Sequence, residues 1–457
     1  MKIDIYQVDA HRCKVKKDTS QALVAKAIGW HDERTQQFKT LLNRTQHGGF
    51  FLCGSVPFVK ERLETWGHSV HYHRILFKRL KYKLTDYTMK GIKLEKYQLK
   101  MIAPVGPTNR GILVSATGSG KTVVMGSIIK RFDIPETLII TPTRDIFDQT
   151  INEFSKWFKT SIGQIGKGTY TIGHITVALF QSLSKLTTGN LKEGDFKLLI
   201  VDEAHKVNKT ILKICKKLPN THYRYGLTAT PQRYDYNFEK AYEQFGCLGP
   251  VLVDIPERET IKRVLPVEVN MLRYVCARPQ GTDYQSVLHE DVLFSEKRNL
   301  MLLKTAMKLA ISKGLTCLIL LDEVKQGEWM VEDARTIGIE PLFAHGSNKI
   351  GVNQKIKDLL NRRKTKLVIA TKVFSTGTDI PNVDCIVLAS SNKSYIDTIQ
   401  KIGRGRRRTS RTTKLIVIDC VDIVIGNRNF HRTFYHRSIE RINTYKEMNW
   451  NVKKTIC

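Results

Sequence analysis

Short apolar runs alternate with amphipathic stretches along most of this chain, and the alternation falls into two blocks. In the first block the runs occupy residues 111–114, 137–140, 175–180, 197–201 and 223–227. Continuous apolar runs of this length are typical of strands buried in a parallel sheet, and amphipathic stretches are typical of covering helices. From about residue 265 the alternation restarts, with runs at 318–321, 341–344 and 366–370. The pattern predicts two α/β units in tandem.

The N-terminal part carries a different pattern. Ile3, Ile5 and Val8 alternate with polar residues as in a half-buried strand, and residues 20–28 are predicted to form a helix after a cap at Thr19 or Ser20. In the basic tail after residue 411 we expect a helix that packs its aromatic residues on a core, and a base-stacking platform is the alternative. We therefore expect three domains: a small N-terminal accessory domain at 1–85, a first α/β domain at 86–260, and a second α/β domain with the basic tail at 261–457.

Charge narrows the class of partner. The 457 residues carry a formal net charge of +31, which indicates a polyanionic partner, most simply nucleic acid. Neither a long apolar segment nor an amphipathic Lys/Trp helix supports a membrane partner. The nine cysteines lack a C-x-x-C pair and the start lacks a signal-peptide pattern, so we expect reduced thiols in a cytoplasmic protein. No zinc is expected, because one cysteine with irregularly spaced histidines is a poor ligand set: Cys53, His68, His71 and His73.

Residues 115–122, Ser-Ala-Thr-Gly-Ser-Gly-Lys-Thr, directly follow the first apolar run. A glycine-containing turn between a strand and a helix points backbone N–H groups inward, where they cradle phosphates. In this turn Lys121 would reach the β- and γ-phosphates, and the Thr122 hydroxyl would hold Mg²⁺. Ser115 stands where the usual pattern has glycine, and the alternative is a chance Gly-Ser turn. The phosphate-binding candidates are Thr117, Gly118, Ser119, Gly120, Lys121 and Thr122.

The apolar run 197–201 ends in Asp202-Glu203-Ala204-His205. Paired carboxylates after a buried strand suit the hydrolysis of Mg²⁺–ATP, because one carboxylate holds the metal and the other positions or activates water. A solvated start of a helix is the alternative. Together with the glycine-rich turn, this pair predicts a nucleoside triphosphatase.

Further polar residues are singled out by position. Gln98 precedes the glycine-rich turn, and its amide can donate to and accept from the edge of adenine, which would select ATP. Thr228-Ala229-Thr230-Pro231 ends another strand and would relay the state of the γ-phosphate. Other residues follow the carboxyl ends of predicted parallel strands, where open sheets bind ligands, and we expect them to contact nucleic-acid phosphates. These residues, for which helix capping is the alternative, are Thr143, Arg144, Gln181 and Ser182.

Two basic stretches complete the candidates. The stretch 71–83 interleaves basic and aromatic residues, which suits phosphate binding and base stacking, although a solvated strand or linker would look the same. Its phosphate-binding candidates are Arg74, Lys78, Arg79 and Lys81. The second stretch, 400–408, is rich in arginine. An arginine inserted from a second domain neutralises charge on the γ-phosphate, and a general basic patch is the alternative.

The motifs SATGSGKT, TPTR, DEAH, TATP, STGTDIP and QKIGRGRR, in this order, resemble those of superfamily 2 helicases and translocases, in particular the group of XPB, RecG and the phage UvsW-type branch-migration enzymes. The resemblance spans about residues 90 to 410. It implies two RecA-like parallel-sheet domains in tandem, with ATP between them and a nucleic-acid strand across them. Asp202 would hold the metal, Glu203 would act as base, and Gln98 would read adenine. The last motif would supply Gln400, Arg404 and the finger Arg407, and the motif before it would supply Gly377 and Asp379.

Three departures from the family pattern are visible. Ser115 replaces a small apolar or glycine residue, Lys401 replaces the usual arginine, and Glu95-Lys96 stands where relatives often have Arg-Pro. The first should be tolerated. The second weakens any role carried over to Lys401, and the third weakens the case for adenine stacking from residues 95–96.

We therefore expect an ATP- and Mg²⁺-dependent DNA helicase or translocase that acts on branched DNA, such as forks and Holliday junctions, in recombination, repair or replication. The alternatives are the motor subunit of a nuclease or restriction system, an RNA helicase, and an ATP-gated clamp without turnover. The expected location is the cytoplasm, which is that of the host if a phage encodes the chain. The sequence leaves the polarity of unwinding and the oligomeric state open, and a monomer is compatible with it.

Overall fold

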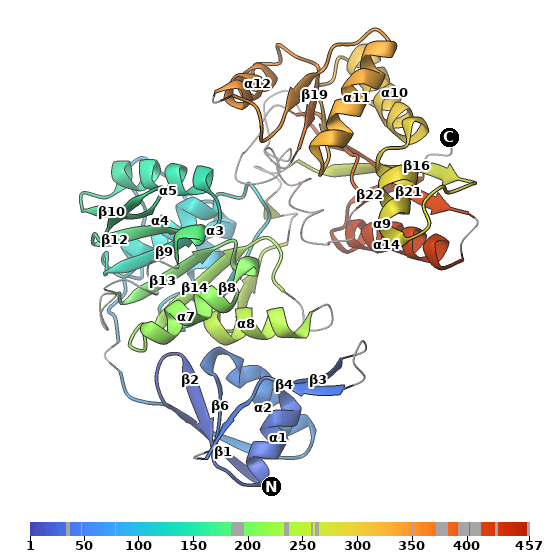
Figure 1. The fold of residues 1–457 in the computed structure, drawn as a ribbon. Coiled ribbons are helices and arrows are strands. Elements are labelled where there is room, and N and C mark those ends of the chain that lie inside the picture. The colour runs from blue at the N-terminus through green and yellow to red at the C-terminus, as the bar shows by residue number, and fades with distance from the viewer. Residues whose placement is uncertain are drawn as a thin grey trace. The chain divides into compact units, whose positions relative to one another are not determined.

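The computed structural model describes residues 1–32, 37–46, 48–77, 79–183, 196–232, 237–256, 259–260, 265–349, 351–371, 383–391, 402, 413–425 and 428–454. The chain forms two compact units (Figure 1). The first comprises Met1–Ser115 and Gly120–Pro256, and the second comprises Glu257–Cys457 together with Ala116–Ser119. Each unit is described by itself.

The N-terminal domain is a five-stranded sheet covered by two helices, with strand order β5-β6-β2-β1-β7. Alternation along β1 sends Ile3 and Ile5 into a core under α1 and α2. The helix α1 is capped by Asp18 and not by the predicted Thr19 or Ser20, because the Asp18 carboxylate accepts from the Ser20 N–H at 2.7 Å. The elements are β1 Lys2–Gln7, β2 Arg12–Val15, α1 Thr19–Ala27, β3 Gly29–Asp32, β4 Gln37–Thr40, β5 Asn43–Thr45, β6 Gly48–Leu52, the 3₁₀ turn η1 Cys53–Ser55, α2 Val56–Thr65 and β7 Ser69–His73.

The first α/β domain is built on an eight-stranded sheet of order β11-β10-β12-β9-β13-β14-β8-β15. The strand pairs are parallel except for β11, which runs antiparallel to β10. The elements are α3 Lys96–Ile102, β8 Arg110–Val114, α4 Lys121–Arg131, β9 Thr137–Thr141, α5 Arg144–Trp157, β10 Ile162–Gly166, β11 Thr169–Thr171, β12 Ile175–Leu179, η2 Phe180–Ser182, β13 Leu198–Asp202, η3 Ala204–Lys206, α7 Lys209–Lys217, β14 Tyr223–Thr228, α8 Phe238–Leu248 and β15 Val251–Asp254.

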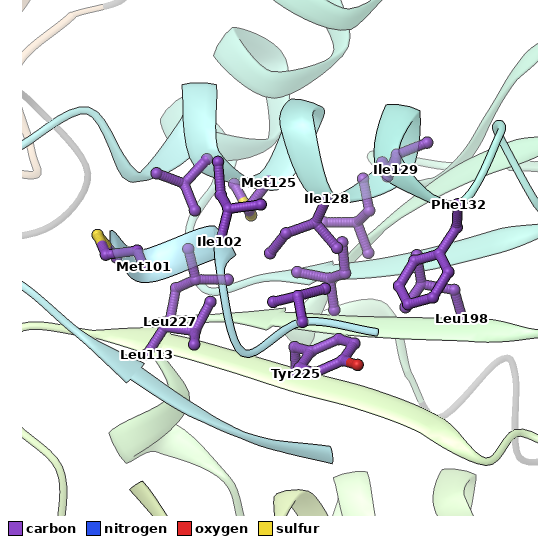
Figure 2. Close-up of a cluster of buried hydrophobic side chains, with 14 of the residues drawn as sticks. Met101, Ile102, Leu113, Met125, Ile128, Ile129, Phe132, Leu198, Tyr225 and Leu227 are labelled. Atoms are coloured by element: carbon purple, nitrogen blue, oxygen red, sulfur yellow. The ribbon is translucent and has the colours of Figure 1, made fainter. Parts of the chain in front are cut away.

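Both faces of this sheet are buried, which explains why its strands are apolar throughout. Along β8, Leu113 packs under α3, α4 and α5, whereas Ile112 and Val114 face α7 and α8. Figure 2 shows the first of these cores, in which Ile128 and Phe132 of α4 lie against Tyr225 and other strand residues. The result is a three-layer α/β/α sandwich that holds the carboxyl ends of the strands at one edge.

The N-terminal domain is joined firmly to the first α/β domain. Tyr242 of α8 is buried in the N-terminal core, and its hydroxyl accepts from the Leu52 N–H at 3.0 Å. The N–H of Ala10 donates to the carbonyl of Pro219 at 2.8 Å, and the carbonyl of Ala10 accepts from Arg110 Nη2 at 2.7 Å. We call this contact the domain join: Ala10 and the segment from Leu52 through η1 on one side, and α8, Arg110 and Pro219 on the other. Because Tyr242 is part of the N-terminal core and these hydrogen bonds connect the two domains, both belong to one compact unit.

The second α/β domain has a seven-stranded sheet of order β18-β19-β17-β20-β21-β16-β22, and all its strand pairs are parallel. Helices α10 and α11 cover one face, and α12 and α14 cover the other. The elements are β16 Val267–Cys276, α9 Tyr284–Ser286, the π-helix η5 Val287–Leu293, α10 Glu296–Ser312, β17 Cys317–Leu320, α11 Val324–Thr336, β18 Leu342–Ala344, α12 Val352–Asn361, β19 Leu367–Ala370, β20 Cys385–Leu388, β21 Leu415–Val424, α14 Arg428–Glu447 and β22 Asn451–Lys454.

The basic tail forms the helix α14 and buries aromatic residues, as expected. Phe434 and Tyr445 are fully buried, whereas Tyr435 is exposed. Arg441 of the same helix is buried and pairs with Asp419 of β21 at 2.8 Å. The predicted fold class, two parallel-sheet α/β domains in tandem plus a small N-terminal domain, is confirmed. Among the residues that the structure describes, none of the helices has the length and apolar character needed to span a membrane.

The close packing at the domain join leaves no room for a side chain at residue 54, so only glycine fits there. A Cβ on Gly54 would lie 2.1 Å from the carbonyl oxygen of Phe245 and 2.8 Å from the N atom of Gly249, both of which are backbone atoms. Gly54→Ala should therefore destabilise the first unit by about 1–3 kcal/mol or force the join apart. Calorimetry would show this as a lower Tm. Gly346→Ala is the control, because nothing lies within 4 Å of a Cβ there; equal Tm values for the two variants would contradict the join.

Candidate nucleotide-binding site

The glycine-rich turn connects β8 to α4 at the carboxyl edge of the first sheet. Ser115 continues β8, since its N–H donates to the carbonyl of Thr228 at 3.1 Å. Gly118 and Gly120 have φ angles of +80° and +84°, in the left-handed region that favours glycine, and Gly120 is the N-cap of α4. Because glycine offers no side chain to cap the helix, the first N–H groups of α4 stay available at the positive end of its dipole. This geometry suits a phosphate chain.

Strand register brings the other predicted groups to the same edge. Thr228 in β14 is the register partner of Val114 in β8, and Leu227 is the register partner of Asp202 in β13. The turn, the Thr228 hydroxyl and the Asp202–Glu203 pair therefore lie on three neighbouring strand ends. Lys121 Nζ donates to the carbonyl of Ser115 at 3.4 Å, so its ammonium lies along the turn.

The two carboxylates occupy different environments. Asp202 is 8% exposed, and its Oδ1 accepts from the Glu203 N–H at 2.9 Å. Glu203 is more accessible and adopts a left-handed φ of +48°, a conformation that for a non-glycine residue costs of order 1–3 kcal/mol and is common at functional sites. Burial and the Glu203 charge raise the pKa of Asp202 to about 7, and the Lys121 ammonium only partly offsets them. Lys121 alone therefore does not balance the negative charge of the two carboxylates, and a divalent cation held by Asp202 would supply the missing positive charge.

A buried hydrogen-bond network connects the carboxylates to the next motif. His205 Nδ1 lies 3.4 Å from Glu203 Oε2 and 3.0 Å from the Thr228 hydroxyl, and burial lowers the pKa of His205 to about 4. Thr228 Oγ1 accepts from the Thr230 N–H at 3.1 Å, and Gln232 Nε2 donates to the carbonyl of His205 at 2.8 Å. Sequence alone gives no role to His205 or Gln232; their only signal is adjacency to the two motifs. A movement of Glu203 would reach Thr228 through His205.

The predicted nucleic-acid residues gather at neighbouring strand ends. Strands β9 and β12 pair in parallel, with Thr141 opposite Leu179, so the residues that follow them share the carboxyl edge. Arg144 and Gln181 are exposed there, and Ser182 is half-buried. Thr143 is the N-cap of α5, since its Oγ1 accepts from the Ile146 N–H at 3.4 Å. The capping alternative therefore holds for Thr143, while its hydroxyl hydrogen remains able to donate.

Gln98 lies in the first turn of α3 and is fully buried. Its Oε1 accepts from the Glu95 N–H at 2.9 Å, which together with the Glu95 side chain forms a capping box. The helix α3 packs on α4, so Gln98 is close in the fold to the helix of the glycine-rich turn. Its role toward adenine stays a prediction.

The basic–aromatic stretch 71–83 begins in β7 and continues along the first α/β domain. Phe77 stacks on His222 with ring centroids 4.0 Å apart, and the Leu80 N–H donates to the Tyr223 hydroxyl at 3.2 Å. These contacts use Phe77 for packing and not for base stacking. The side chains of Arg74, Arg79 and Lys81 are exposed, and Arg74 lies over the Tyr72 ring at 5.5 Å.

Several predicted residues lie outside the described part of the chain, and their roles stay predictions. They are Lys78, Gly377, Asp379, Gln400, Arg404 and Arg407.

Fold and site together define a P-loop nucleoside triphosphatase with a second parallel-sheet domain. Comparison with protein families places this class more narrowly. Residues 91–233 match the family described as "Type III restriction enzyme, res subunit", and residues 300–409 match the "Helicase conserved C-terminal domain". The chain belongs to the superfamily 2 helicases, which are ATP-dependent enzymes.

Similar proteins fit this assignment. "Putative helicase 22" of Sulfolobus islandicus filamentous virus is 26% identical over 394 residues, which cover 78% of this chain and 68% of that protein. "ATP-dependent DNA helicase uvsW" of Enterobacteria phage T4 is 25% identical over 398 residues, which cover 80% and 78%. The solved structure of S. cerevisiae Dbp5 bound to RNA and ADP BeF3 shares the fold, with a TM-score of 0.55 at 16% identity over 80% of this chain and 91% of that one.

The raised pKa of Asp202 predicts how stability depends on pH. The folded protein keeps a proton that the unfolded chain loses between pH 3.8, the ordinary pKa of Asp, and about pH 7. Stability should therefore fall as pH rises through this window, and Asp202→Asn removes the effect. We expect Asp202→Asn to raise the Tm by about 2–5 °C more at pH 8 than at pH 4. Scanning calorimetry at both pH values checks this.

The control variant is Glu61→Gln, which changes an exposed carboxyl of α2. It should leave the pH dependence of Tm as in the wild type. If the Asp202→Asn variant keeps the wild-type pH dependence of Tm, Asp202 is not the carboxyl whose raised pKa causes that dependence.

Proposed function

We propose that this chain is an ATP-dependent DNA helicase or translocase that acts on branched DNA such as forks and Holliday junctions. The site and the family support ATP-driven action on nucleic acid. The net charge of +31 suits a polyanion. DNA is favoured because the phage T4 relative, similar over most of its length, is named a DNA helicase. The T4 protein also belongs to the group whose motifs this chain resembles.

In this proposal the first α/β domain binds and activates ATP. The N–H groups of residues 117–120 hold the phosphates, and Lys121 neutralises the β- and γ-phosphates. Thr122 and Asp202 hold Mg²⁺, which supplies positive charge to the phosphate oxygens. Glu203 positions water and accepts its proton, and the contact from Glu203 through His205 to Thr228 carries the state of the site toward the strand ends at Arg144 and Gln181.

The second α/β domain completes the reaction in this proposal. Arg407 acts as the finger that neutralises the γ-phosphate in the transition state, with Gln400 and Arg404 beside it, and Gly377 and Asp379 couple the nucleotide to the strand. We also propose that the three parts 1–85, 86–260 and 261–457 act as junction-binding, ATP-binding and finger-supplying modules.

The observation that carries the branched-DNA proposal is the domain join. Stepping along one strand needs only the two α/β domains, whereas holding a junction needs a further surface in a fixed position. The N-terminal domain is fixed to the first α/β domain through Tyr242 and Leu52, so it moves with that domain. The chain leaves this domain at the end of β7, and the next exposed cations are Arg74, Arg79 and Lys81. In this proposal they hold duplex while one strand is pulled.

The first test addresses ATP turnover. Glu203→Gln should lower kcat for ATP hydrolysis by at least about 100-fold, because it removes the base, and should leave ATP binding nearly unchanged, because Asp202 and Lys121 remain. Steady-state hydrolysis and equilibrium binding of a fluorescent ATP analogue measure the two effects, with Glu61→Gln as the control. Hydrolysis by Glu203→Gln at the wild-type rate would show that another group activates water.

The second test addresses the junction surface. Substituting Arg74, Arg79 and Lys81 together by Ala should lower fork unwinding about tenfold or more, while ATP hydrolysis stimulated by single-stranded DNA changes less than about twofold. The control removes the same charge from exposed positions on helices α5 and α7, namely Lys156, Lys213 and Lys216. Removal of the whole N-terminal domain is a poor test, because it would expose Tyr242 and leave Arg110 unpaired.

A panel of forks, Holliday junctions, blunt duplex and RNA duplex separates the alternatives. Preference for RNA would make the chain an RNA helicase, and cleavage of DNA in the presence of ATP would favour a nuclease motor. Equal loss of fork unwinding in both triple variants would place the junction surface elsewhere.

A further inference from the structure

Four buried cysteines lie in two close pairs beside the domain join. The Sγ atoms of Cys13 in β2 and Cys53 in η1 are 3.0 Å apart, and so are those of Cys215 in α7 and Cys247 in α8. None of the four side chains is more than 5% exposed. These contacts are shorter than two unbonded sulfur atoms ordinarily make, and a small side-chain movement would bring each pair to the bond length of about 2.05 Å.

Each pair has one cysteine in an element of the domain join: Cys53 lies in η1 and Cys247 lies in α8, and these two elements contact each other. Cys53 opens η1, and the next residue, Gly54, packs against the backbone at Phe245. Cys247 lies two residues further along α8 than Phe245. A bond between Cys13 and Cys53 would tie η1 to β2, and a bond between Cys215 and Cys247 would tie α8 to α7. The two bonds would brace the join from both sides.

Two buried guanidinium groups lie beside these sulfurs. Arg224 donates to the carbonyls of Thr221, Leu218 and Cys215, and Arg110 donates to the carbonyl of Ala10. Within the described residues, Nη1 of each arginine has no hydrogen-bond partner, and neither forms a salt bridge with a carboxylate. Buried positive charge of this kind favours a thiolate nearby.

The thiols respond to this charge unequally. A hydrogen bond from Cys247 holds the pKa of Cys215 down to about 7, with Arg224 and Arg110 contributing, although burial opposes them. Burial raises the pKa of Cys53, but the hydrogen bond from Cys13 and the guanidinium of Arg110 outweigh it, so the net direction is downward. Burial raises the pKa of Cys13, and the contact with Cys215 raises that of Cys247. Each pair therefore combines one thiol whose pKa is lowered with a second thiol whose pKa is raised, and we assign the first as the attacking group and the second as the resolving group.

We propose that Cys13–Cys53 and Cys215–Cys247 are sites of disulfide formation that brace the domain join. The oxidant is a small disulfide such as oxidised glutathione, which reaches these thiols while the chain refolds, before they are buried. The Cys53 thiolate attacks one of its sulfurs, forms a mixed disulfide and releases one thiolate, which takes up the proton of Cys13. The Cys13 thiolate then attacks Cys53 and displaces the second glutathione. Two protein thiols are oxidised and one small disulfide is reduced to two thiols; Cys215 and Cys247 react in the same way.

Two comparisons within the chain sharpen the proposal. Among the described residues, no group of three or more His, Cys, Asp or Glu is arranged to hold a metal ion, so the four sulfurs are not a zinc site of this kind. Cys317 and Cys385 are register partners in β17 and β20, and their thiols are hydrogen-bonded, while the Cys317 thiol also donates to the carbonyl of Ala306 at 3.3 Å. In that cross-strand pair of the second unit, the contact with Cys317 and burial raise the pKa of Cys385 well above its ordinary value, so the pair serves as an internal control.

The test uses the full chain, refolded or incubated with either oxidised glutathione or dithiothreitol. Free thiols are then blocked with iodoacetamide under denaturing conditions, and peptide mapping by mass spectrometry locates the links. We expect Cys13–Cys53 and Cys215–Cys247 links after oxidation, and a Tm about 5–10 °C higher than in dithiothreitol, because each link closes a long loop in the unfolded chain. ATP hydrolysis should stay within about twofold, since no catalytic group of the site takes part.

Variants separate the two bonds. Cys53→Ser and Cys215→Ser should each abolish one link and part of the Tm gain, whereas Cys317→Ser should keep both links and the full gain. Alkylation of all four cysteines after oxidation, or links to other cysteines only, would overturn the proposal. If a serine variant fails to fold, the map of the wild-type chain still decides. Absence of helicase activity both in dithiothreitol and after oxidation would count against the proposed function and not against the disulfides.

Discussion

The chemistry of the first α/β domain depends on the parallel register of three buried strands, β8, β14 and β13. Because both faces of the sheet are covered by helices, the strands have no freedom to slide, and a shift of one residue would turn their side chains to the opposite face. The register places the end of β8 level with Thr228 and brings Asp202 to the neighbouring strand end. The glycine-rich turn and the carboxylate pair therefore meet with no direct bond between them. The uncompensated charge of Asp202 is the energetic cost of this arrangement, and bound metal would relieve it.

The domain join extends this rigidity to the N-terminal domain. The helix α8 packs one side on the sheet, through Cys247 and Leu248, and places Tyr242 in the N-terminal core. One helix thus connects the strand that ends in Thr228 with the surface that we propose for junctions. A protein that must hold duplex with one part while pulling on another benefits from such a connection, because force is transmitted without a flexible linker. One cysteine pair includes Cys247 of this helix and the other, Cys13–Cys53, lies in the N-terminal core that receives Tyr242, so both bonds would strengthen the same connection.

Local sequence determined the parts that depend on neighbouring residues. The turn from Ser115 to Thr122 and the pair Asp202–Glu203 were predictable because strand, turn and helix follow one another within a few residues. The cap of α1 was predicted at Thr19 or Ser20 but lies at Asp18. All three residue types can cap a helix, and the sequence does not show which of them accepts from the first N–H groups. The docking of residues 1–73 on α8 left no local signal, because Tyr242, Leu52 and Gly54 act across nearly two hundred positions of sequence. The contact of Cys215 with Cys247 was likewise invisible in the spacing of the cysteines, because it depends on the packing of α7 against α8.

The central claim is that ATP turnover at this site is driven by nucleic acid. The most direct measurement is the rate of ATP hydrolysis by the full chain as the concentration of a forked DNA rises, at fixed low salt and saturating Mg²⁺ and ATP. The account predicts a low basal rate and a saturable increase of about tenfold or more, with the half-saturating DNA concentration rising steeply as salt is added. A rate that is the same with and without fork, duplex, single-stranded DNA or RNA would contradict it.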